Sequence, residues 1–321
     1  MRIGVITNLK AGRGARDSER VLAMLEAYPD ITSVVTDRST NVRDVVADLA
    51  AKEIDLLVVN GGDGTLQRTL TEVLEDRAFE RTPVIAPLRS GRTNSSARDL
   101  GIHKSPVLAM DRIIDLSRRD DLGANLVRRD VLRITLDADG AARDVHCGMF
   151  CGFGVIDRAI RRTHERFPEG RAQGAFGGAM MAAGLLSSLA LGRRDPLLEP
   201  DAMSLRFDDE EATSGDYQLV ISSTLEHAFL KLKPFWGQGP GAVRITAIEA
   251  GAPKMARSIS RIVRALPPSA EGEVSGYTSR NVDQVEIAAG CGLTIDGELF
   301  PPREGRTVRL EALPNISFVR G

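Results

Sequence analysis

The stretch that decides the fold is Asp55-Leu-Leu-Val-Val-Asn60-Gly61-Gly62-Asp63-Gly64-Thr65. It opens with an uninterrupted apolar run that ends at Asn60, and apolar residues then recur at helical spacing from Leu66 to Leu74. The hydrophobic period therefore changes from that of a buried strand to that of an amphipathic helix across a glycine-rich turn. The sequence predicts a strand, a tight loop and the start of a helix.

The three glycines of this loop favour an anion such as a phosphate group. They lack Cβ atoms, so backbone N–H groups can converge, and the N-terminus of the following helix adds partial positive charge. Asp63 would repel a phosphate unless it reaches a metal ion, a substrate hydroxyl or a helix N–H. The alternative is a plain strand-to-helix turn in which Asp63 or Thr65 caps the helix.

The composition is that of a globular protein with room for two ordinary domains. The 321 residues are 42% hydrophobic and 27% charged, and the formal net charge of −2 gives no general attraction to nucleic acid. The N-terminus enters a strand directly and lacks the layout of a signal peptide, so we expect a cytoplasmic protein. The three cysteines are too few for a disulfide framework, and the sequence shows no zinc motif.

Strands and helices alternate through residues 1–125, which we take as the first domain. The expected strands are Arg2–Asn8, Ser33–Asp37, Ile54–Asn60 and Pro83–Pro87, with helices around Val21–Leu25 and over Val42–Lys52 between them. This alternation predicts a parallel α/β sheet. Because ligands gather at the carboxyl ends of parallel strands, the loops that follow them should share one crevice.

Residues 126–321 change to a pattern of short strands, which predicts a second, mostly antiparallel domain. Asp130–Leu136 and Val145–Cys151 are expected to form a hairpin around the turn at Asp139-Gly140. Further strands are expected at Met203–Phe207, Tyr217–Ser222, Val243–Ala247 and Val282–Ala288.

The string Gly61–Thr65 resembles the nucleotide-binding signature shared by diacylglycerol kinases, sphingosine and ceramide kinases, their bacterial relatives, and NAD kinases. The lipid-kinase resemblance covers nearly the whole chain and is weakest over Arg158–Glu210. It implies an NAD kinase-like catalytic domain and then a β-sandwich that holds the lipid, with the C-terminal end packing back on the first domain. It also implies ATP and Mg²⁺ as cofactors. The enzyme would be a phosphotransferase that transfers the γ-phosphoryl group to a hydroxyl of diacylglycerol, ceramide or a sphingoid base.

The resemblance also implies a set of nucleotide contacts. These are Asn8, Gly12, Thr36, Gly61, Gly62, Asp63, Gly64, Thr65, Gln67, Arg92, Thr93 and Asn94. The segment around Asn94 departs from the family pattern, because Arg92 stands where Thr is usual and Ser95 replaces an Asp. We hypothesise that Arg92 partly replaces the threonine contact with its guanidinium, which a loss of nucleotide affinity in Arg92→Ala would test.

Leu293–Phe300 contains Asp296-Gly297-Glu298, which resembles the Asp-Gly-Glu signature of these kinases. Taken alone, Asp-Gly between apolar residues is a hairpin turn. Phosphoryl transfer needs neutralisation by magnesium and a group that receives the hydroxyl proton. The resemblance implies Glu298 as the base, Asp296 as its assistant and Asp63 as the group that orients the acceptor or magnesium. The same three carboxylates are the magnesium candidates, and the sequence leaves open which one takes the proton.

Two segments concern the acceptor. Gly152–Asp157 resembles the family stretch whose Asp meets the lipid head group, so Asp157 is the substrate candidate; the alternative is a cap before a helix at Arg158–Glu165. Ala172–Gly192 has no charged residue and is flanked by arginines. We expect a helix over an apolar pocket, a helix dipping into a membrane surface, or a buried scaffold helix.

Leu225–Gly237 resembles a strand edge of bacterial relatives, in which an Asp-Gly segment then helps to bind magnesium. Here that segment is Gly239-Pro-Gly-Ala-Val243, so the resemblance does not extend to this metal site.

Two other functions stay open. An NAD kinase would carry an Asn-Glu pair where Asn94-Ser95 stands and would lack the Asp-Gly-Glu ending. A non-catalytic lipid- or nucleotide-binding protein is favoured by the altered Asn94 segment and opposed by the retained carboxylates. The expected partners are a lipid substrate and a membrane surface in peripheral contact, such as the inner membrane face, without nucleic acid; a homodimer is compatible with the sequence.

Overall fold

The computed structural model describes residues 1–9, 15–37, 40–75, 78–91, 94–119, 121–137, 143–166, 188, 195–225, 233–269 and 274–321. The chain divides into two compact units, one made of Met1–Arg129 with Pro314–Gly321 and the other of Asp130–Leu313. Strands β5 (Leu126–Asp137) and β15 (Thr307–Val319) each begin in one unit and end in the other. The predicted nucleotide contacts Gly12, Arg92 and Thr93 and nearly all of Ala172–Gly192 lie outside the described residues.

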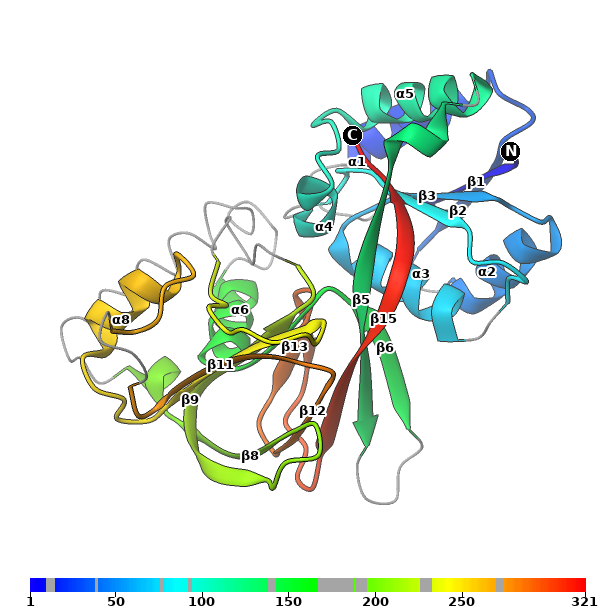
Figure 1. Cartoon of the computed structure of the whole chain (residues 1–321). Coiled ribbons are helices and arrows are strands. Elements are labelled where there is room, and N and C mark those ends of the chain that lie inside the picture. Colours follow the sequence, from blue (N-terminus) through cyan, green and yellow to red (C-terminus); the bar gives the residue numbers. More distant parts are fainter. Residues whose placement is uncertain are drawn as a thin grey trace. The chain divides into compact units, whose positions relative to one another are not determined.

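The first unit contains the predicted parallel α/β sheet (Figure 1). Its strands run in the order β2–β1–β3–β4–β15, in which β1 is Ile3–Asn8, β2 is Thr32–Thr36, β3 is Leu56–Asn60 and β4 is Val84–Pro87. All five residues of β3 are buried, as its continuous apolar run predicts. Asn8 pairs with Thr36, and Thr7 pairs with Asn60. The loops after these strands therefore start at one edge of the sheet.

Helices cover both faces of this sheet. α1 (Ala15–Leu25) and α5 (Pro106–Arg118) pack together over one face, and α2 (Val42–Ala51) and α3 (Asp63–Glu75) over the other (Figure 1). A side chain caps the N-terminus of both α2 and α5. Asn41 accepts from the N–H of Arg43, and Ser105 accepts from the N–H of Leu108. A short α4 (Ser95–Asp99) follows β4, and a 3₁₀ turn at Leu122–Asn125 precedes β5.

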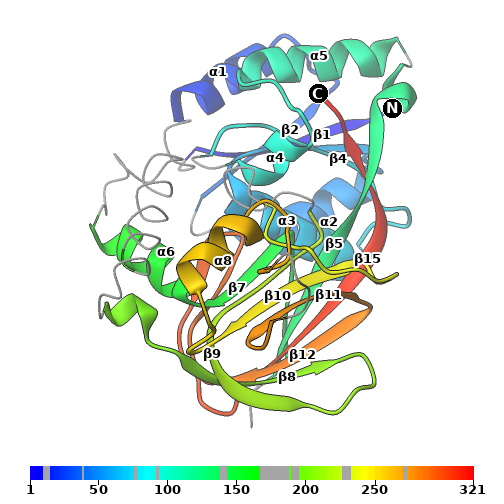
Figure 2. The ribbon, with the colours of Figure 1, turned by 60° about the vertical axis from the view of Figure 1, so that its left-hand side comes forward.

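The second unit is mostly antiparallel, as expected (Figure 2). Its strands follow the order β14–β13–β7–β9–β8–β12–β15, with β10 paired to β9 and β11, and β5 paired to β6. The strands are β6 (Asp144–Gly148), β7 (Phe150–Gly154), β8 (Asp201–Phe207), β9 (Thr213–Ser223), β10 (Val243–Glu249), β11 (Tyr277–Val282), β12 (Gln284–Ala289), β13 (Leu293–Ile295) and β14 (Glu298–Phe300). Helices α6 (Val155–Arg166) and α8 (Met255–Ile262) and a 3₁₀ turn at Pro196–Leu198 complete it.

The prediction of one strand over Val145–Cys151 is wrong. The strand breaks at Met149, so β6 pairs with β5 whereas β7 pairs with β9 and β13. The N–H of Met149 donates to Asp296 Oδ2 at 2.9 Å, and its carbonyl accepts from Ser223 Oγ at 2.7 Å and from the Thr224 N–H at 3.3 Å. Because a side chain holds the N–H of Met149, that group is not available to a strand ladder.

The strand predicted over Val282–Ala288 is found as β12, which begins two residues later, at Gln284. Val282 instead ends β11, a strand that the sequence did not predict. The carboxylate of Asp208 accepts from the N–H groups of both Asp283 and Gln284, each at 2.9 Å. The chain therefore turns out of one strand pair and into another at this point.

Across the described parts of the chain, no helix has both the length and the apolar character needed to cross a membrane.

Candidate active site

The glycine loop after β3 is packed so tightly that side chains are excluded from it. A Cβ on Gly61 would lie 2.6 Å from the side chain of Thr65, in the first turn of α3. Gly62 lies directly against Gly91 of the β4–α4 loop, where a Cβ on Gly62 would come within 3.0 Å of the Gly91 Cα atom. Two loops therefore meet backbone to backbone at the N-terminus of α3, where an anion is stabilised.

Asp63 lies in the first turn of α3, beside α4. Its Oδ2 atom accepts from Ser95 Oγ at 3.3 Å, and its Oδ1 atom accepts from the N–H of Ser96 at 3.4 Å. Burial raises the pKa of the Asp63 carboxyl above its usual value, and the hydrogen bonds from Ser95 and Ser96 oppose that rise. Sequence reasoning treated Ser95 only as a departure from a motif. In the structure Ser95 is a direct partner of the carboxylate.

Asn60, at the end of β3, is the buried centre of the polar groups behind the loop. Its Nδ2 atom donates to Thr7 Oγ1 at 3.2 Å, and its Oδ1 atom accepts from Ser90 Oγ at 2.5 Å and Ser18 Oγ at 3.5 Å. One amide therefore joins β1, α1 and the β4–α4 loop. Its place at the polar end of an apolar strand was the available sequence signal, but the partners could not be read from it.

Replacing Asn60 by Ala should lower the free energy of unfolding by about 2–4 kcal/mol, because the hydroxyls of Thr7 and Ser90 would lose their buried partner. Urea unfolding measures this change. Asn125→Ala is the matched control, since the Asn125 amide donates only to the Asp121 carbonyl near the surface. Equal effects of the two substitutions would contradict the central role of Asn60.

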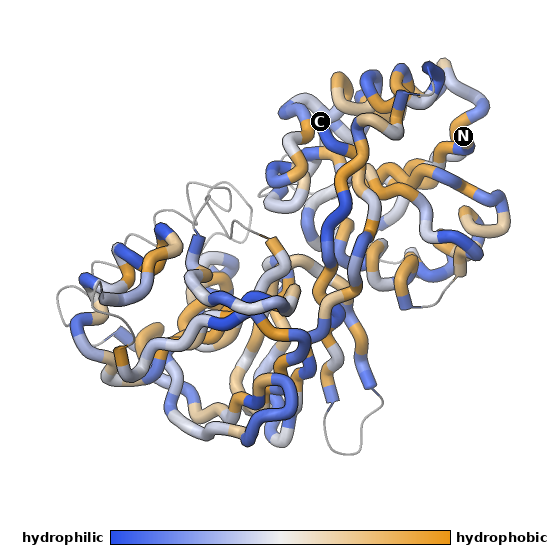
Figure 3. Tube along the Cα trace, in the orientation of Figure 1, coloured by the Kyte–Doolittle hydropathy of each residue, from blue (hydrophilic) through white to orange (hydrophobic). Residues whose placement is uncertain are grey.

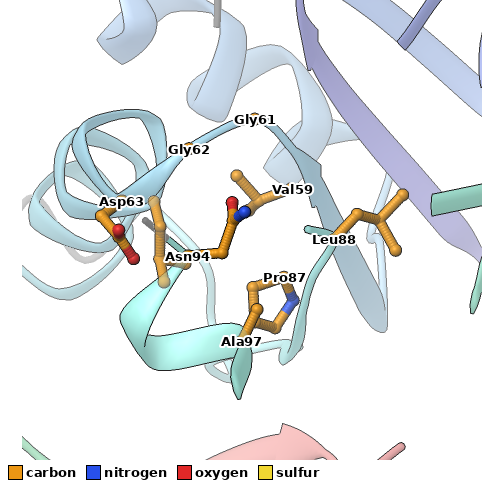
Figure 4. Close-up of a pocket in the computed structure, with 9 residues that line it drawn as sticks. Val59, Gly61, Gly62, Asp63, Pro87, Leu88, Asn94 and Ala97 are labelled. Carbon is orange, nitrogen blue, oxygen red and sulfur yellow. The ribbon is translucent and has the colours of Figure 1, made fainter. Parts of the chain in front are cut away.

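Asn94, a predicted nucleotide contact, closes the β4–α4 loop. Its Oδ1 atom accepts from the Gly91 N–H at 2.7 Å and its Nδ2 atom donates to the Gly91 carbonyl at 2.8 Å. Asn94 itself has a left-handed backbone with φ of 51°. Between Asn94, Asp63 and Leu88 lies a cavity of about 10 Å³, with room for about one water molecule (Figure 4). This cavity is part of the packing under the loop and is too small for a nucleotide.

The other described nucleotide candidates gather near the same edge of the sheet. Asn8 donates from Nδ2 to Thr65 Oγ1 at 3.0 Å, which joins the end of β1 to the first turn of α3. Thr36 is buried and donates to the Thr7 carbonyl at 3.4 Å. Gln67 is buried within α3 and donates to Thr71 Oγ1 at 3.4 Å. These contacts place the residues within one unit, and their binding of a nucleotide stays a prediction.

Asp296-Gly297 forms a two-residue hairpin turn between β13 and β14. Both residues have positive φ, 48° for Asp296 and 92° for Gly297, and Ile295 pairs with Glu298 across the turn. These are the features of a type I′ turn. Asp296 is partly buried and holds the Met149 N–H, and Glu298 is exposed. Gly148 permits this approach, because a Cβ there would lie 2.6 Å from Asp296 Oδ2.

Two substitutions separate the charge of Asp296 from its structural role. Asp296→Asn keeps an acceptor for the Met149 N–H and tolerates the positive φ, so the free energy of unfolding should stay near wild type. Asp296→Ala loses both the acceptor for the Met149 N–H and the tolerance of positive φ, so it should lower the free energy of unfolding by about 1–3 kcal/mol. Urea unfolding of both variants measures this difference, and an alanine variant as stable as the asparagine variant would contradict the structural role.

Asp157, the predicted head-group contact, is a buried residue of α6. The helix begins at Val155, so the alternative interpretation of Asp157 as a cap preceding the helix is wrong. Arg161 Nη2 lies 3.2 Å from both carboxylate oxygens, and a Cβ on Gly292 would come within 2.5 Å of Asp157 Oδ2. Burial raises the pKa of Asp157, and Arg161 opposes the rise. The carboxylate is thus engaged inside the unit, and its contact with a lipid stays a prediction.

The segment that carries a magnesium-binding Asp-Gly in relatives is shaped here by close backbone packing. A Cβ on Gly237 would lie 2.5 Å from the N atom of Arg280, and Cβ atoms on Gly239 and Gly241 would overlap the backbone of β11. The segment supplies no carboxylate. Among the described residues, no three His, Cys, Asp or Glu side chains come together as a metal site.

Asp63 belongs to the first unit, and Asp296 and Glu298 belong to the second. The predicted meeting of these three carboxylates is therefore still a prediction.

The first comparison with known proteins matches residues that lie within the first unit. Residues 2–124 match the family model of the diacylglycerol kinase catalytic domain. A stretch of 104 residues is 36% identical to "Probable lipid kinase YegS-like" of Pseudomonas aeruginosa (strain UCBPP-PA14); it covers 32% of this chain and 33% of the relative. Residues 2–124 are therefore similar to the catalytic domain of diacylglycerol kinases. The matched stretch spans about a third of that relative's length.

Solved structures extend the likeness in fold to the whole chain. The crystal structure of a diacylglycerol kinase from Bacillus anthracis str. Sterne is similar with a TM-score of 0.60 at 16% identity, over 100% of this chain and 97% of the other. A further crystal structure from the same organism gives a TM-score of 0.64 at 17% identity, over the same shares. The two-domain fold of this chain is therefore similar to the fold of these two solved structures.

Proposed function

We propose that this protein is an ATP-dependent lipid kinase that transfers the γ-phosphoryl group of ATP to a hydroxyl of a lipid such as diacylglycerol, ceramide or a sphingoid base. The observation that carries the proposal is the contact of Gly62 with Gly91 beside Asp63. This contact joins two glycine backbones at a helix N-terminus, with a carboxylate in the first turn of that helix. Phosphoryl transfer needs this pairing of a phosphate cradle and a carboxylate.

The residues of the first unit fit a nucleotide with its magnesium ion. In the first turn of α3 the N–H groups of Thr65 and Leu66 donate to the Gly62 carbonyl, so the N–H groups of Asp63 and Gly64 are the ones that would meet phosphate oxygens. Magnesium bound to a nucleotide keeps several waters and needs only one or two protein carboxylates, so Asp63 suffices in this unit. Bound ATP and magnesium would supply the phosphoryl group and neutralise its charge.

The chain's own residues then have separate roles. The hydrogen bonds from Ser95 and Ser96 hold the Asp63 carboxylate in place, where it would orient the acceptor hydroxyl or a magnesium ligand. Exposed Glu298 is the candidate that receives the hydroxyl proton, and Asp296 fixes the turn that carries it. The identity of the lipid depends on the second unit.

The experiment is a transfer assay with γ-labelled ATP, magnesium and separate detergent dispersions of diacylglycerol, ceramide and a sphingoid base, with NAD as a further acceptor. Label on one lipid would support the proposal and name its substrate class. Label on NAD alone would overturn it in favour of an NAD kinase. Binding of ATP without any labelled product would favour the non-catalytic alternative.

A further inference from the structure

A row of basic side chains lies along α8 in the second unit. Lys254, Arg257, Arg261 and Arg264 are here called the basic stripe. Arg257 and Arg261 are four residues apart on one side of α8, Lys254 is the N-cap of this helix and Arg264 follows its C-cap. Lys254, Arg257 and Arg264 are exposed, and Arg261 is partly exposed. No Asp or Glu occurs between Ala250 and Ser269, whereas the whole chain has a net charge of −2.

The opposite side of α8 fixes the orientation of the helix. Ile262 is 3% exposed and belongs to a small core with Ile248 and Tyr277. Ser258 is equally buried, and Tyr277 Oη donates to the Pro253 carbonyl at 2.8 Å, just before the helix. Hydrophilic and hydrophobic residues accordingly alternate along α8 (Figure 3). The stripe therefore points to solvent because its helix is anchored by the other side.

The charges of the stripe are not neutralised within the described part of the chain. No described carboxylate lies within ion-pair distance of any of the four, and Arg261 donates to the Pro267 carbonyl at 2.8 Å. The helix dipole accounts for Arg261 and Arg264, since cations are favoured at a C-terminus. It disfavours Lys254 and Arg257 at the N-terminal end. The helix dipole therefore does not account for these two exposed charges.

An exposed apolar side chain adjoins the stripe. Leu266, two residues beyond Arg264, is 43% exposed and precedes Pro267 and Pro268. Cations beside a projecting apolar side chain match the anionic headgroups and the acyl region of a bilayer. Nucleic acid offers the same charge but no place for Leu266, and the overall charge of the chain does not attract it.

We propose that the basic stripe and Leu266 bind the anionic surface of a lipid bilayer. Anionic lipid attracts each cation of the stripe, and Leu266 enters the headgroup region. The surface is independent of the phosphoryl-transfer chemistry, but a kinase with a lipid acceptor would use it to reach membrane-bound substrate.

Cosedimentation of the full chain with vesicles tests the proposal. Wild type should bind vesicles of phosphatidylcholine mixed with phosphatidylglycerol, more weakly as salt rises, and should not bind phosphatidylcholine alone. The double variant Arg257→Gln/Arg264→Gln should bind about 25-fold more weakly, since each Lys or Arg near an anionic surface contributes about fivefold. Leu266→Ser should weaken binding further.

The matched control is Arg81→Gln/Arg112→Gln, which removes the same charge from two exposed positions of the first unit. Equal losses in the control and the stripe variant would overturn the proposal, as would binding to RNA in place of vesicles. Phosphorylation of a lipid dispersed in detergent should be unchanged in the stripe variant and reduced on vesicles. Vesicle binding without any kinase activity would leave this surface standing and reject the proposed function alone.

Discussion

Under the proposed function, Asp63→Asn is expected to lower phosphoryl transfer to lipid by about 10²- to 10⁴-fold, because the carboxylate proposed to orient the acceptor or magnesium loses its charge. The asparagine keeps the shape of the side chain and can still accept from the Ser96 N–H. Steady-state kinetics with the labelled-ATP assay measure the loss. Asp111→Asn on α5 removes the same charge from an exposed site and should leave the rate unchanged.

The same variant should not be less stable than wild type at neutral pH. The folded-state pKa of Asp63 is raised above its usual value of 3.8, so the ionised carboxylate destabilises the fold. Wild-type stability should therefore fall as pH rises from 3.8 through the raised pKa, and this fall should be smaller in Asp63→Asn. Thermal unfolding of both proteins, without nucleotide or magnesium, measures the difference at each pH. If Asp63→Asn were less stable than wild type at pH 7 but equally stable at acidic pH, the effect of the Asp63 charge on stability would be opposite to the one expected.

Gly91→Ala is expected to disrupt the loop that faces Gly62. The new Cβ atom would overlap the Cα of Gly62 and lie 2.9 Å from Asn94 Oδ1. Backbone atoms cannot move aside as a flexible side chain can, so the free energy of unfolding should fall by about 1–3 kcal/mol. Displacement of the N–H groups proposed to bind phosphate by about 1 Å should weaken ATP binding by roughly tenfold or more.

Gly123→Ala is the control for this substitution, because nothing lies within 4 Å of a Cβ at Gly123. It should leave both the unfolding curve and ATP affinity, measured by titration calorimetry, near wild type. If Gly91→Ala also left both unchanged, the backbone contact of the two loops would not control the site.

Local patterns were sufficient for several elements. The change of period across Asn60–Gly64 predicted β3, the loop and α3, because burial of a strand and of a helix face each leaves a periodic trace in the sequence. The Asp296-Gly297 dipeptide predicted a hairpin turn, since these residues tolerate the positive φ that such a turn requires. Both inferences needed only neighbouring residues.

Other features depended on residues far apart in the chain. Met149 ends β6 because Asp296, 147 positions later, accepts from its N–H. Asp283 separates β11 from β12 because Asp208, 75 positions earlier, accepts from the N–H of Asp283. Either stretch alone has the apolar pattern of one continuous strand. Only the folded chain shows that a distant carboxylate takes the backbone group on which the ladder depends.

The sequence by itself determined the alternation of strands and helices in the first domain, the change from a parallel to an antiparallel domain and the position of the glycine loop. The tertiary structure decided which polar groups meet: Ser95 with Asp63, Asn60 with Thr7 and Ser90, and Asp157 with Arg161. The physical reason is that periodicity records whether a side chain is buried, whereas the partner of a buried polar group is set by the approach of separate segments within a few ångströms.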